Sequence, residues 1–252
     1  MSAMAEAQKK DHIYMYQFSN KGTGSSATIS HFCAKLQVWL ELAGLPYTLI
    51  NHELPAGPYN KLPYIELNGE QYGETAIIID MLSNKYDKDF DSGLSNEQKA
   101  LGNAVKRMFE EHTFFLCVND RWFNNLDLFG GHFIGTVQSY PVFMRPLVKQ
   151  IAKRRLLGAT YTQGVGRLPE EERKKRLHED ISALSTILGE KKYILSDDKP
   201  TTVDATVFGF MWCELGVDPE YEKVCAFCQE CKKYDNLMSY YERMMKLMNR
   251  SK

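Results

Sequence analysis

A short stretch around residue 74 has the residue types of a binding site for a zwitterion. Glu74 and Thr75 follow Gly73 and directly precede the apolar run 76–86. The first turn of a helix offers free N–H groups and the positive end of the helix dipole, which together favour a carboxylate. An acidic side chain beside them can hold an ammonium group. We therefore expect Glu74 and Thr75 to bind a ligand that carries both charges. The structural alternative is an ordinary N-cap in which Thr75 satisfies one free N–H.

A second candidate group lies at the start of the helix predicted from residue 32. Ser30 precedes His31, and Cys33 follows three residues after Ser30. The dipole at a helix N-terminus stabilises a nearby thiolate. A serine stands where a Cys-x-x-Cys pair has its first cysteine, so a two-thiol redox centre is not available. Ser30 is expected to donate a hydrogen bond to a bound thiolate, with Cys33 as the alternative reactive group. The structural alternatives are an N-cap for Ser30 and a small buried apolar side chain for Cys33.

A third candidate is the Leu62-Pro63 pair, which directly precedes a predicted strand. Most X–Pro bonds in folded proteins are trans, with a cis fraction of about 5–6%. A proline just before this strand and opposite the first helix favours a cis bond. Such a bond would turn the backbone N–H and C=O of Leu62 outward, where they can pair with an extended ligand as a strand would.

The only cluster with metal-like spacing is Cys225-x-x-Cys228-x-x-Cys231. Positions three apart on a helix stay close to one face, so three thiols can meet a soft cation. A closed zinc site needs a fourth ligand, and no histidine lies near enough in the sequence to supply it. We therefore expect no bound metal and keep Cys225, Cys228 and Cys231 as weak candidates beside their interpretation as structural thiols.

The order of the predicted elements indicates how the first three groups come together. The hydrophobic pattern predicts strands at 12–18, 47–50, 64–67 and 70–72, and helices at 32–43 and 76–86. Gly44 ends the first helix, and Asn68-Gly69 predicts a tight hairpin. This order is typical of a thioredoxin-like α+β domain. We place that domain at residues 12–87, after a disordered N-terminus at 1–11.

The rest of the chain is predicted to be an all-helical domain at residues 95–252, joined by a polar linker at 88–94. Thr201 and Asp204 have the spacing of a capping box at the start of a strongly apolar helix. This pair is expected to serve folding rather than chemistry.

Residues 120–144 are rich in aromatic side chains, which favours a core or a hydrophobic pocket. The basic run 149–155 is expected to form the solvated face of a helix. The chain has 31 basic and 32 acidic residues and a net charge of −1. That balance gives no electrostatic reason to expect nucleic acid or an anionic membrane as a partner.

The six cysteines are scattered, and the N-terminal residues contain no apolar signal segment. These features favour a reducing, cytoplasmic location with free thiols. No stretch approaches the length of about 18 apolar residues that a membrane-spanning helix needs. We therefore expect no integral membrane segment.

Several stretches together match the pattern of one protein family. They lie at residues 32–36, 43–47, 61–69, 121–122, 164–167 and 199–209. These stretches resemble the cytosolic glutathione transferases, and most closely the metaxin-like branch that contains the failed axon connections proteins and the cadmium-responsive proteins of nematodes. The resemblance covers nearly all of residues 12–247 and implies a thioredoxin-like domain followed by an all-α domain.

The resemblance also assigns roles to the candidate residues. It implies that Glu74 and Thr75 bind the γ-glutamyl end of glutathione, that Leu62 and Pro63 form the backbone site, and that Ser30 lies at the thiol. The family pattern has proline where this chain has His31. A histidine there would assist deprotonation or act as a cation at low pH, or it would be a surface residue.

The implied function is glutathione binding, with conjugation to small hydrophobic electrophiles in detoxification or stress response. An alternative is a non-catalytic interaction protein of the failed axon connections type, which keeps the fold for a role in axon development. A third is the handling of soft metals such as cadmium. The resemblance implies glutathione as the ligand, and a second copy or a protein as partner. Whether the chain is an enzyme stays open at this point.

Overall fold

A four-stranded mixed sheet forms the N-terminal half of the chain. The structure is a computed structural model that describes residues 10–19 and 28–250, so the prediction for residues 1–11 falls almost entirely outside it. The strands are β1 (Ile13–Phe18), β2 (Tyr47–His52), β3 (Tyr64–Leu67) and β4 (Glu70–Gly73). Their order is β2-β1-β3-β4; β1 is parallel to β2 and antiparallel to β3. The predicted thioredoxin-like arrangement is confirmed.

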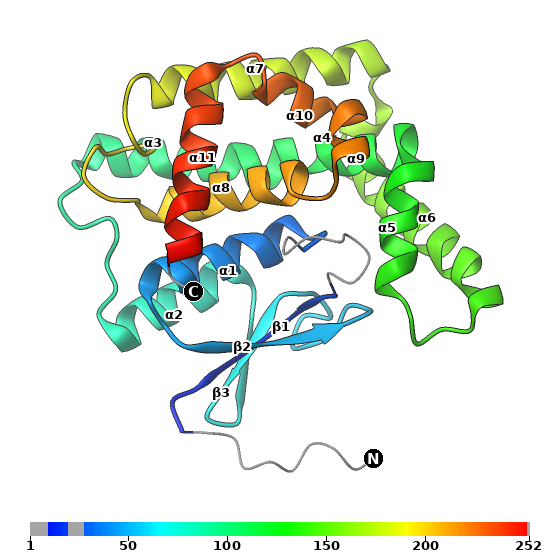
Figure 1. The fold of residues 1–252 in the computed structure, drawn as a ribbon, viewed down its shortest axis with the longest axis horizontal. Coiled ribbons are helices and arrows are strands. Elements are labelled where there is room, and N and C mark those ends of the chain that lie inside the picture. Colours follow the sequence, from blue (N-terminus) through cyan, green and yellow to red (C-terminus); the bar gives the residue numbers. More distant parts are fainter. Residues whose placement is uncertain (1–9, 20–27, 251–252) are drawn as a thin grey trace.

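Two helices pack on this sheet and carry the candidate residues at their first turns. They are α1 (His31–Ala43) and α2 (Thr75–Tyr86), and both lie between the sheet and the remaining helices (Figure 1). Gly44 ends α1 in the left-handed conformation, with φ 62°. Asn68 and Gly69 both have positive φ, as a two-residue hairpin turn between β3 and β4 requires. The turn signals in the sequence are therefore confirmed.

The rest of the described chain is helical. The elements are α3 (Asn96–Arg107), η1 (Met108–Thr113), α4 (Phe114–Asn119), η2 (Asp120–Asn124), α5 (Leu126–Thr136), η3 (Val142–Met144), α6 (Arg145–Gln163), η4 (Val165–Arg167), α7 (Glu170–Leu188), α8 (Thr202–Leu215), α9 (Pro219–Val224), α10 (Ala226–Cys231) and α11 (Asp235–Arg250). Among the described residues, no helix has both the length and the apolar character needed to cross a membrane.

Helix α8 joins the two halves of the molecule. It packs against α1 so closely that a Cβ on Gly209 would lie 2.7 Å from the backbone Cα and N of Lys35. Figure 1 shows α8 running alongside α1. Its start has the predicted capping box, because the Asp204 carboxylate accepts hydrogen bonds from Thr201 while Thr201 caps the helix. Since α8 is buried from Val203 to Leu215, the two halves share one hydrophobic core.

The aromatic stretch at 120–144 only partly follows its prediction as core or pocket. Trp122, Phe129 and Phe133 are buried and stack edge to face. Phe123 and Phe143, in contrast, are mostly exposed. Phe123 lies on η2, whereas Phe143 lies on the hairpin formed by α5, η3 and α6, which stands at the right-hand edge of the molecule in Figure 1.

Candidate functional site

The first turn of α2 is capped by its own acidic residue. Glu74 is the N-cap, and its carboxylate accepts hydrogen bonds from Ala76 N at 2.9 Å and from Ile77 N at 3.3 Å. Glu74 has φ 67° and is exposed to solvent. The alternative interpretation made Thr75 the cap, but Thr75 is the first residue of the helix. A carboxylate therefore does occupy these N–H groups in this structure, and it belongs to Glu74.

Thr75 faces inward, toward a buried lysine. Its side chain is 2% exposed, and Oγ1 accepts a hydrogen bond from Lys35 Nζ at 2.9 Å. The same ammonium forms a 2.6 Å ion pair with Glu110 at the start of the helical half. Burial lowers the pKa of Lys35, while the Glu110 carboxylate opposes that shift. The result is a positive charge directly beneath the N-terminus of α2.

Lys35 is a residue that the sequence interpretation missed as part of this site. It lies one residue before Leu36, within a helix whose other residues are mostly apolar. A lysine at 1% exposure inside such a helix requires a partner, because an unpaired buried ammonium is costly. The isolated cation among apolar residues was the available signal. Its partners, Thr75 and Glu110, lie 40 and 75 residues away and follow from the fold alone.

The Leu62–Pro63 peptide bond is cis, as the sequence interpretation expected. Both residues are buried, and they directly precede β3. The backbone of Leu62 therefore lies next to the strand that pairs with β1.

Ser30 caps α1, and Cys33 lies in the core. Ser30 is the N-cap of α1, and its Oγ accepts a hydrogen bond from Cys33 N at 3.3 Å. Cys33 is fully buried. Burial raises the pKa of its thiol to about 11, although hydrogen bonds to Ser30, Phe18 and Thr28 act in the opposite direction. Cys33 is thus a protonated thiol in the core, whereas the half-buried Ser30 stands at the helix terminus.

His31 is the least expected of the candidate residues, because it is neither on the surface nor beside an open site. It is 1% exposed, and its Nε2 lies 2.6 Å from Glu214 Oε1 on α8. Burial lowers the pKa of His31, and the charge of Arg121 lowers it further. An ionised carboxylate only accepts hydrogen bonds, so the neutral ring carries its proton on Nε2 and donates it to Glu214.

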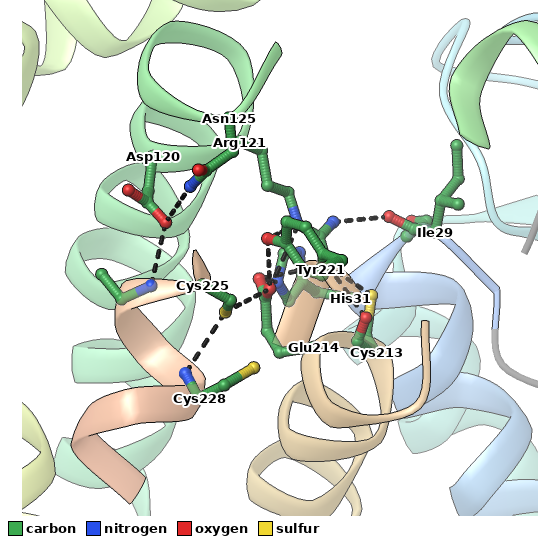
Figure 2. A network of polar contacts seen from close by, with 12 residues as sticks. Ile29, His31, Asp120, Arg121, Asn125, Cys213, Glu214, Tyr221, Cys225 and Cys228 are labelled. Atoms are coloured by element: carbon green, nitrogen blue, oxygen red, sulfur yellow. Dashed lines mark hydrogen bonds and ion pairs between the residues drawn. The ribbon is translucent and has the colours of Figure 1, made fainter. Parts of the chain in front are cut away.

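Arg121 completes this interdomain network, which Figure 2 shows in close view. Its guanidinium donates to Ile29 O at 2.8 Å and to Cys213 O at 2.9 Å, and lies 3.1 Å from Glu214 Oε1. Tyr221 donates to Glu214 Oε2 at 2.9 Å. Burial alone would raise the pKa of Glu214, but Arg121 and His31 hold it at about 2. The cluster is therefore a satisfied buried ion pair that ties the segment before α1 to α8.

The three C-terminal cysteines only partly meet. Cys225 Sγ accepts from Cys228 N at 3.2 Å and lies 3.4 Å from Glu214 Oε2. Potential ligand atoms of Glu214, Cys225 and Cys228 lie within 4.8 Å of one another, as do those of His31, Cys117 and Glu214. Within the described residues Cys231 belongs to neither group, so the three thiols kept as weak metal candidates do not gather at one point.

The donor chemistry of this cluster does not suit a cation. Burial raises the pKa of Cys225 and that of Cys228, so both thiols hold their protons. The only carboxylate in the group, Glu214, is already paired with Arg121. A metal would have to replace a guanidinium that donates to several acceptors, and we assign these residues to the packing of the two halves.

A cleft of about 360 Å³ lies where the end of β2 meets the α5–α6 connection. Glu53 holds the connection in place, because its carboxylate accepts hydrogen bonds from Ser139 N at 2.9 and 3.1 Å and from Ser139 Oγ at 3.0 Å. The residues that line the cleft are His52, Glu53, Leu54, Pro55, Ala56, Ser139 and Tyr140.

Comparison with known protein families accounts for both halves of this arrangement. Residues 31–127 match the sequence model of the glutathione S-transferase N-terminal domain, and residues 177–244 match that of the C-terminal domain. The chain belongs to the glutathione S-transferase-like proteins. The resemblance stated from the sequence is therefore confirmed.

Two curated relatives share enough sequence with this glutathione S-transferase-like protein to be informative. Failed axon connections of Drosophila melanogaster is 31% identical over 212 residues, which are 81% of this chain and 50% of the relative. This chain thus spans about half the length of that protein. The isoprene-epoxide–glutathione S-transferase of Rhodococcus sp. (strain AD45) is 29% identical over 225 residues, which are 86% of this chain and 92% of the relative.

Solved structures agree on the fold. Glutathione S-transferase III in its apo form superposes with a TM-score of 0.58 at 12% identity, covering 95% of this chain and 94% of that one. A Bombyx mori glutathione transferase gives 0.58 at 14% identity, covering 96% and 92%. The glutathione S-transferase-like protein thus has the complete two-part architecture of these structures.

Proposed function

We propose that this protein binds glutathione across the first turns of α1 and α2. The observation that carries the proposal is the buried Lys35 ammonium 2.9 Å from Thr75 Oγ1. Thr75 accepts from Lys35, so its own hydroxyl proton is left to donate to a ligand. The helix dipole of α2 and the Lys35 charge act together at this point and favour a carboxylate, such as that of the γ-glutamyl group.

Glu74 takes two positions in this proposal. Without a ligand, its carboxylate accepts hydrogen bonds from the N–H groups of Ala76 and Ile77. The γ-glutamyl carboxylate displaces it, since both groups have the same charge and shape. Glu74 is exposed and free to turn outward, where it pairs with the ammonium of the ligand.

The other half of glutathione is assigned to α1 and to the segment before β3. The cysteinyl backbone pairs with the backbone of Leu62, with Pro63 fixing the start of β3. Ser30 Oγ accepts from Cys33 N and still has its own proton to donate, so it hydrogen-bonds the glutathione thiolate. The six cysteines are free thiols, which supports a reducing, cytoplasmic location.

The reaction that fits this arrangement is conjugation to a small electrophile. The glutathione thiol loses its proton to water, and the thiolate attacks an electrophilic carbon to form a C–S bond. The name of the Rhodococcus relative points to an epoxide as the electrophile. In that case the C–O bond of the ring breaks, and the oxygen takes up a proton. Detoxification and stress response are the settings in which such chemistry is used.

Titration calorimetry with glutathione tests the binding proposal. Thr75→Val removes the hydroxyl without changing the shape of the side chain, and Ser95→Ala removes a capping hydroxyl at α3 as the matched control. We expect binding between micromolar and millimolar glutathione in the wild type and in Ser95→Ala, and at least about tenfold weaker binding in Thr75→Val. No heat of binding at millimolar glutathione in the wild type would refute the proposal.

A second candidate is a non-catalytic interaction protein, as the likeness to failed axon connections suggests. The specific observation in its favour is that the N-terminus of α2 is already occupied by a side chain of the protein itself. The Glu74 carboxylate accepts hydrogen bonds from its N–H groups, and Thr75 is buried. Turnover of a chromogenic aryl halide with glutathione separates the two. Turnover that falls in Ser30→Ala supports the transferase. Glutathione binding without turnover in the wild type supports the interaction protein.

A further inference from the structure

The tip of the α5–α6 hairpin exposes apolar side chains on the outside of the molecule. Val142 is 73% exposed, Phe143 83%, Leu147 58% and Ile151 60%. Large apolar side chains are usually half-buried even at a surface, and a contiguous exposed group of them marks an interaction site. Figure 1 shows that the hairpin stands apart from α7 and α11 and reaches to the level of the sheet.

Val142 and Phe143 lie on η3, and the two other side chains continue along one face of α6 together with cations. At about 3.6 residues per turn, Leu147, Ile151 and Arg154 fall on the same side of the helix. Arg154 and Arg155 are both exposed. The outward face of α6 is therefore apolar in its first two turns, continuing from Phe143, and cationic in the third.

The stretch of chain that carries this face has charges of one sign. Between Asp127 and Glu170 the sequence contains six basic residues and no acidic residue. They are Arg145, Lys149, Lys153, Arg154, Arg155 and Arg167. The rest of the chain has 25 of the 31 basic residues against all 32 acidic ones. The overall charge of −1, which argued against an anionic membrane as partner, thus conceals a local cationic region on an otherwise acidic chain.

The hairpin is held in a fixed position. Arg145 Nε donates to Tyr140 O at 2.9 Å, and its Nη2 donates to Gln138 O at 2.9 Å, which closes the turn between the helices. Glu53 fastens the same turn to the end of β2 through Ser139. These hydrogen bonds fix the position of the turn that carries the exposed apolar side chains.

We propose that the α5–α6 hairpin docks on an anionic phospholipid surface. The apolar side chains Val142, Phe143, Leu147 and Ile151 enter the boundary between headgroups and acyl chains, and Arg154 and Arg155 contact the anionic headgroups. An apolar face flanked by basic residues is the pattern of a helix that lies in the membrane interface without crossing it. Basic side chains near such a helix gain from the negative surface potential of the membrane.

Other occupants fit the same face less well. A symmetric contact with a second copy would bring two cationic faces together, which is repulsive. A nucleic acid would use the cations but would leave Phe143 and Leu147 against phosphates. A lipid surface offers negative charge and an apolar layer side by side.

Vesicle co-sedimentation tests the proposal with the full chain. The vesicles are phosphatidylcholine alone and phosphatidylcholine with about 30% phosphatidylserine. The test variants are Phe143→Ser/Leu147→Ser and Arg154→Gln/Arg155→Gln. The matched controls are Val224→Ser, another exposed apolar residue, and Lys174→Gln/Lys175→Gln, which makes the same change in net charge on α7.

We expect the wild type and both controls to bind the phosphatidylserine vesicles, and high salt to release them. Each test variant should bind roughly tenfold or more weakly, since each removes two of the contacts. Circular dichroism verifies that the variants are folded, as substitutions at exposed positions predict.

Several results would overturn the proposal. One is no binding of the folded wild type to the phosphatidylserine vesicles. Another is equal loss in Lys174→Gln/Lys175→Gln, which would mean that only net charge matters. A third is a wild-type dimer in sedimentation equilibrium that Phe143→Ser/Leu147→Ser converts to a monomer, without vesicle binding. A fourth is binding to homopolymer RNA but not to vesicles.

Discussion

Single buried charges decide much of the behaviour of this protein. Lys35 and Arg121 are both almost fully buried, and each is matched by a carboxylate from a distant segment. Such pairs contribute little net stability compared with apolar packing, but losing one partner is costly because the other charge stays buried. The loss of stability on substituting Lys35 or Arg121 therefore measures the cost of leaving its buried carboxylate partner without a counter-charge.

Lys35→Met should lower the free energy of unfolding by about 3–5 kcal/mol, because Glu110 is left buried without its partner. Glu110→Gln in the same background should recover part of that loss, since it removes a buried charge that keeps only the exposed Arg107, 3.8 Å away, as a partner. Urea denaturation of both single variants and the double variant measures the coupling between the two side chains. Additive losses would show that the ion pair is not formed.

His31 should make stability depend on pH below neutrality. Its pKa in the folded chain is below the usual 6.5, so the unfolded chain takes up a proton first as the pH falls. Stability is then full above pH 6.5 and decreases below it, by at most about 1.4 kcal/mol per pH unit. Glu214, with its pKa of about 2, adds a similar loss only below about pH 4.5.

Thermal or urea unfolding between pH 7.5 and 5.5 measures this slope. His31→Gln keeps a donor toward Glu214 but cannot titrate, so the slope should become smaller. A slope that is the same in His31→Gln and in the wild type would contradict the assignment.

At the scale of elements, the contact between α1 and α8 is closely packed. Gly209 is required there because any side chain would meet the backbone of Lys35 at 2.7 Å. Neither backbone can move easily, since α8 is buried along its length and α1 is packed on the sheet. The contact therefore leaves no space for a methyl group.

Gly209→Ala should destabilise the protein by about 1–3 kcal/mol, although alanine by itself favours a helix. Gly158 on α6 is the matched control, because a Cβ there meets nothing within 4 Å. Gly158→Ala should be neutral or stabilise by up to about 1 kcal/mol. Denaturant midpoints of the two variants give the comparison, and a stabilising Gly209→Ala would show that the helices are further apart.

The sequence was most informative about local structure. The Asn68-Gly69 hairpin, the Gly44 helix end and the Thr201–Asp204 capping box are each signalled within a few residues, and each is present. The order of strands and helices followed from these signals and from the hydrophobic pattern. The cis Leu62–Pro63 bond was expected from its position.

The sequence was least informative where distant segments meet. The buried position of His31 depends on Glu214, which is 183 residues away in the sequence. A local sequence pattern gives no information about a contact between such distant residues. The helical spacing of the three cysteines likewise did not reveal that Cys225 and Cys228 lie near Glu214 while Cys231 does not. Chain-wide charge hid the cationic α5–α6 hairpin, since averaging over 252 residues removes local asymmetry.

At the scale of the whole molecule, the two halves should unfold together. They share a core, and the Arg121 network and the α1–α8 contact cross between them. Trp39 reports on the sheet half, while Trp122 and Trp212 report on the helical half. Urea transitions followed by tryptophan fluorescence and by far-ultraviolet circular dichroism should coincide.

Arg121→Met should shift the transition seen by both probes to lower urea by the equivalent of about 3–5 kcal/mol, because Glu214 loses its cation and the carbonyl of Ile29 loses its donor. Lys85→Met removes a solvent-exposed cation in the sheet half and should have little effect. Two separate transitions in the wild type would contradict the coupling of the halves.

The Glu214 contact also has a consequence for how the chain is made. His31 and Arg121 leave the ribosome well before Glu214, and the delay between His31 and Glu214 is roughly ten seconds or more at typical synthesis rates. During that time, His31 and Arg121 lack the carboxylate with which both pair in the finished molecule. The network can therefore close only after α8, the helix that carries Glu214, has been synthesised.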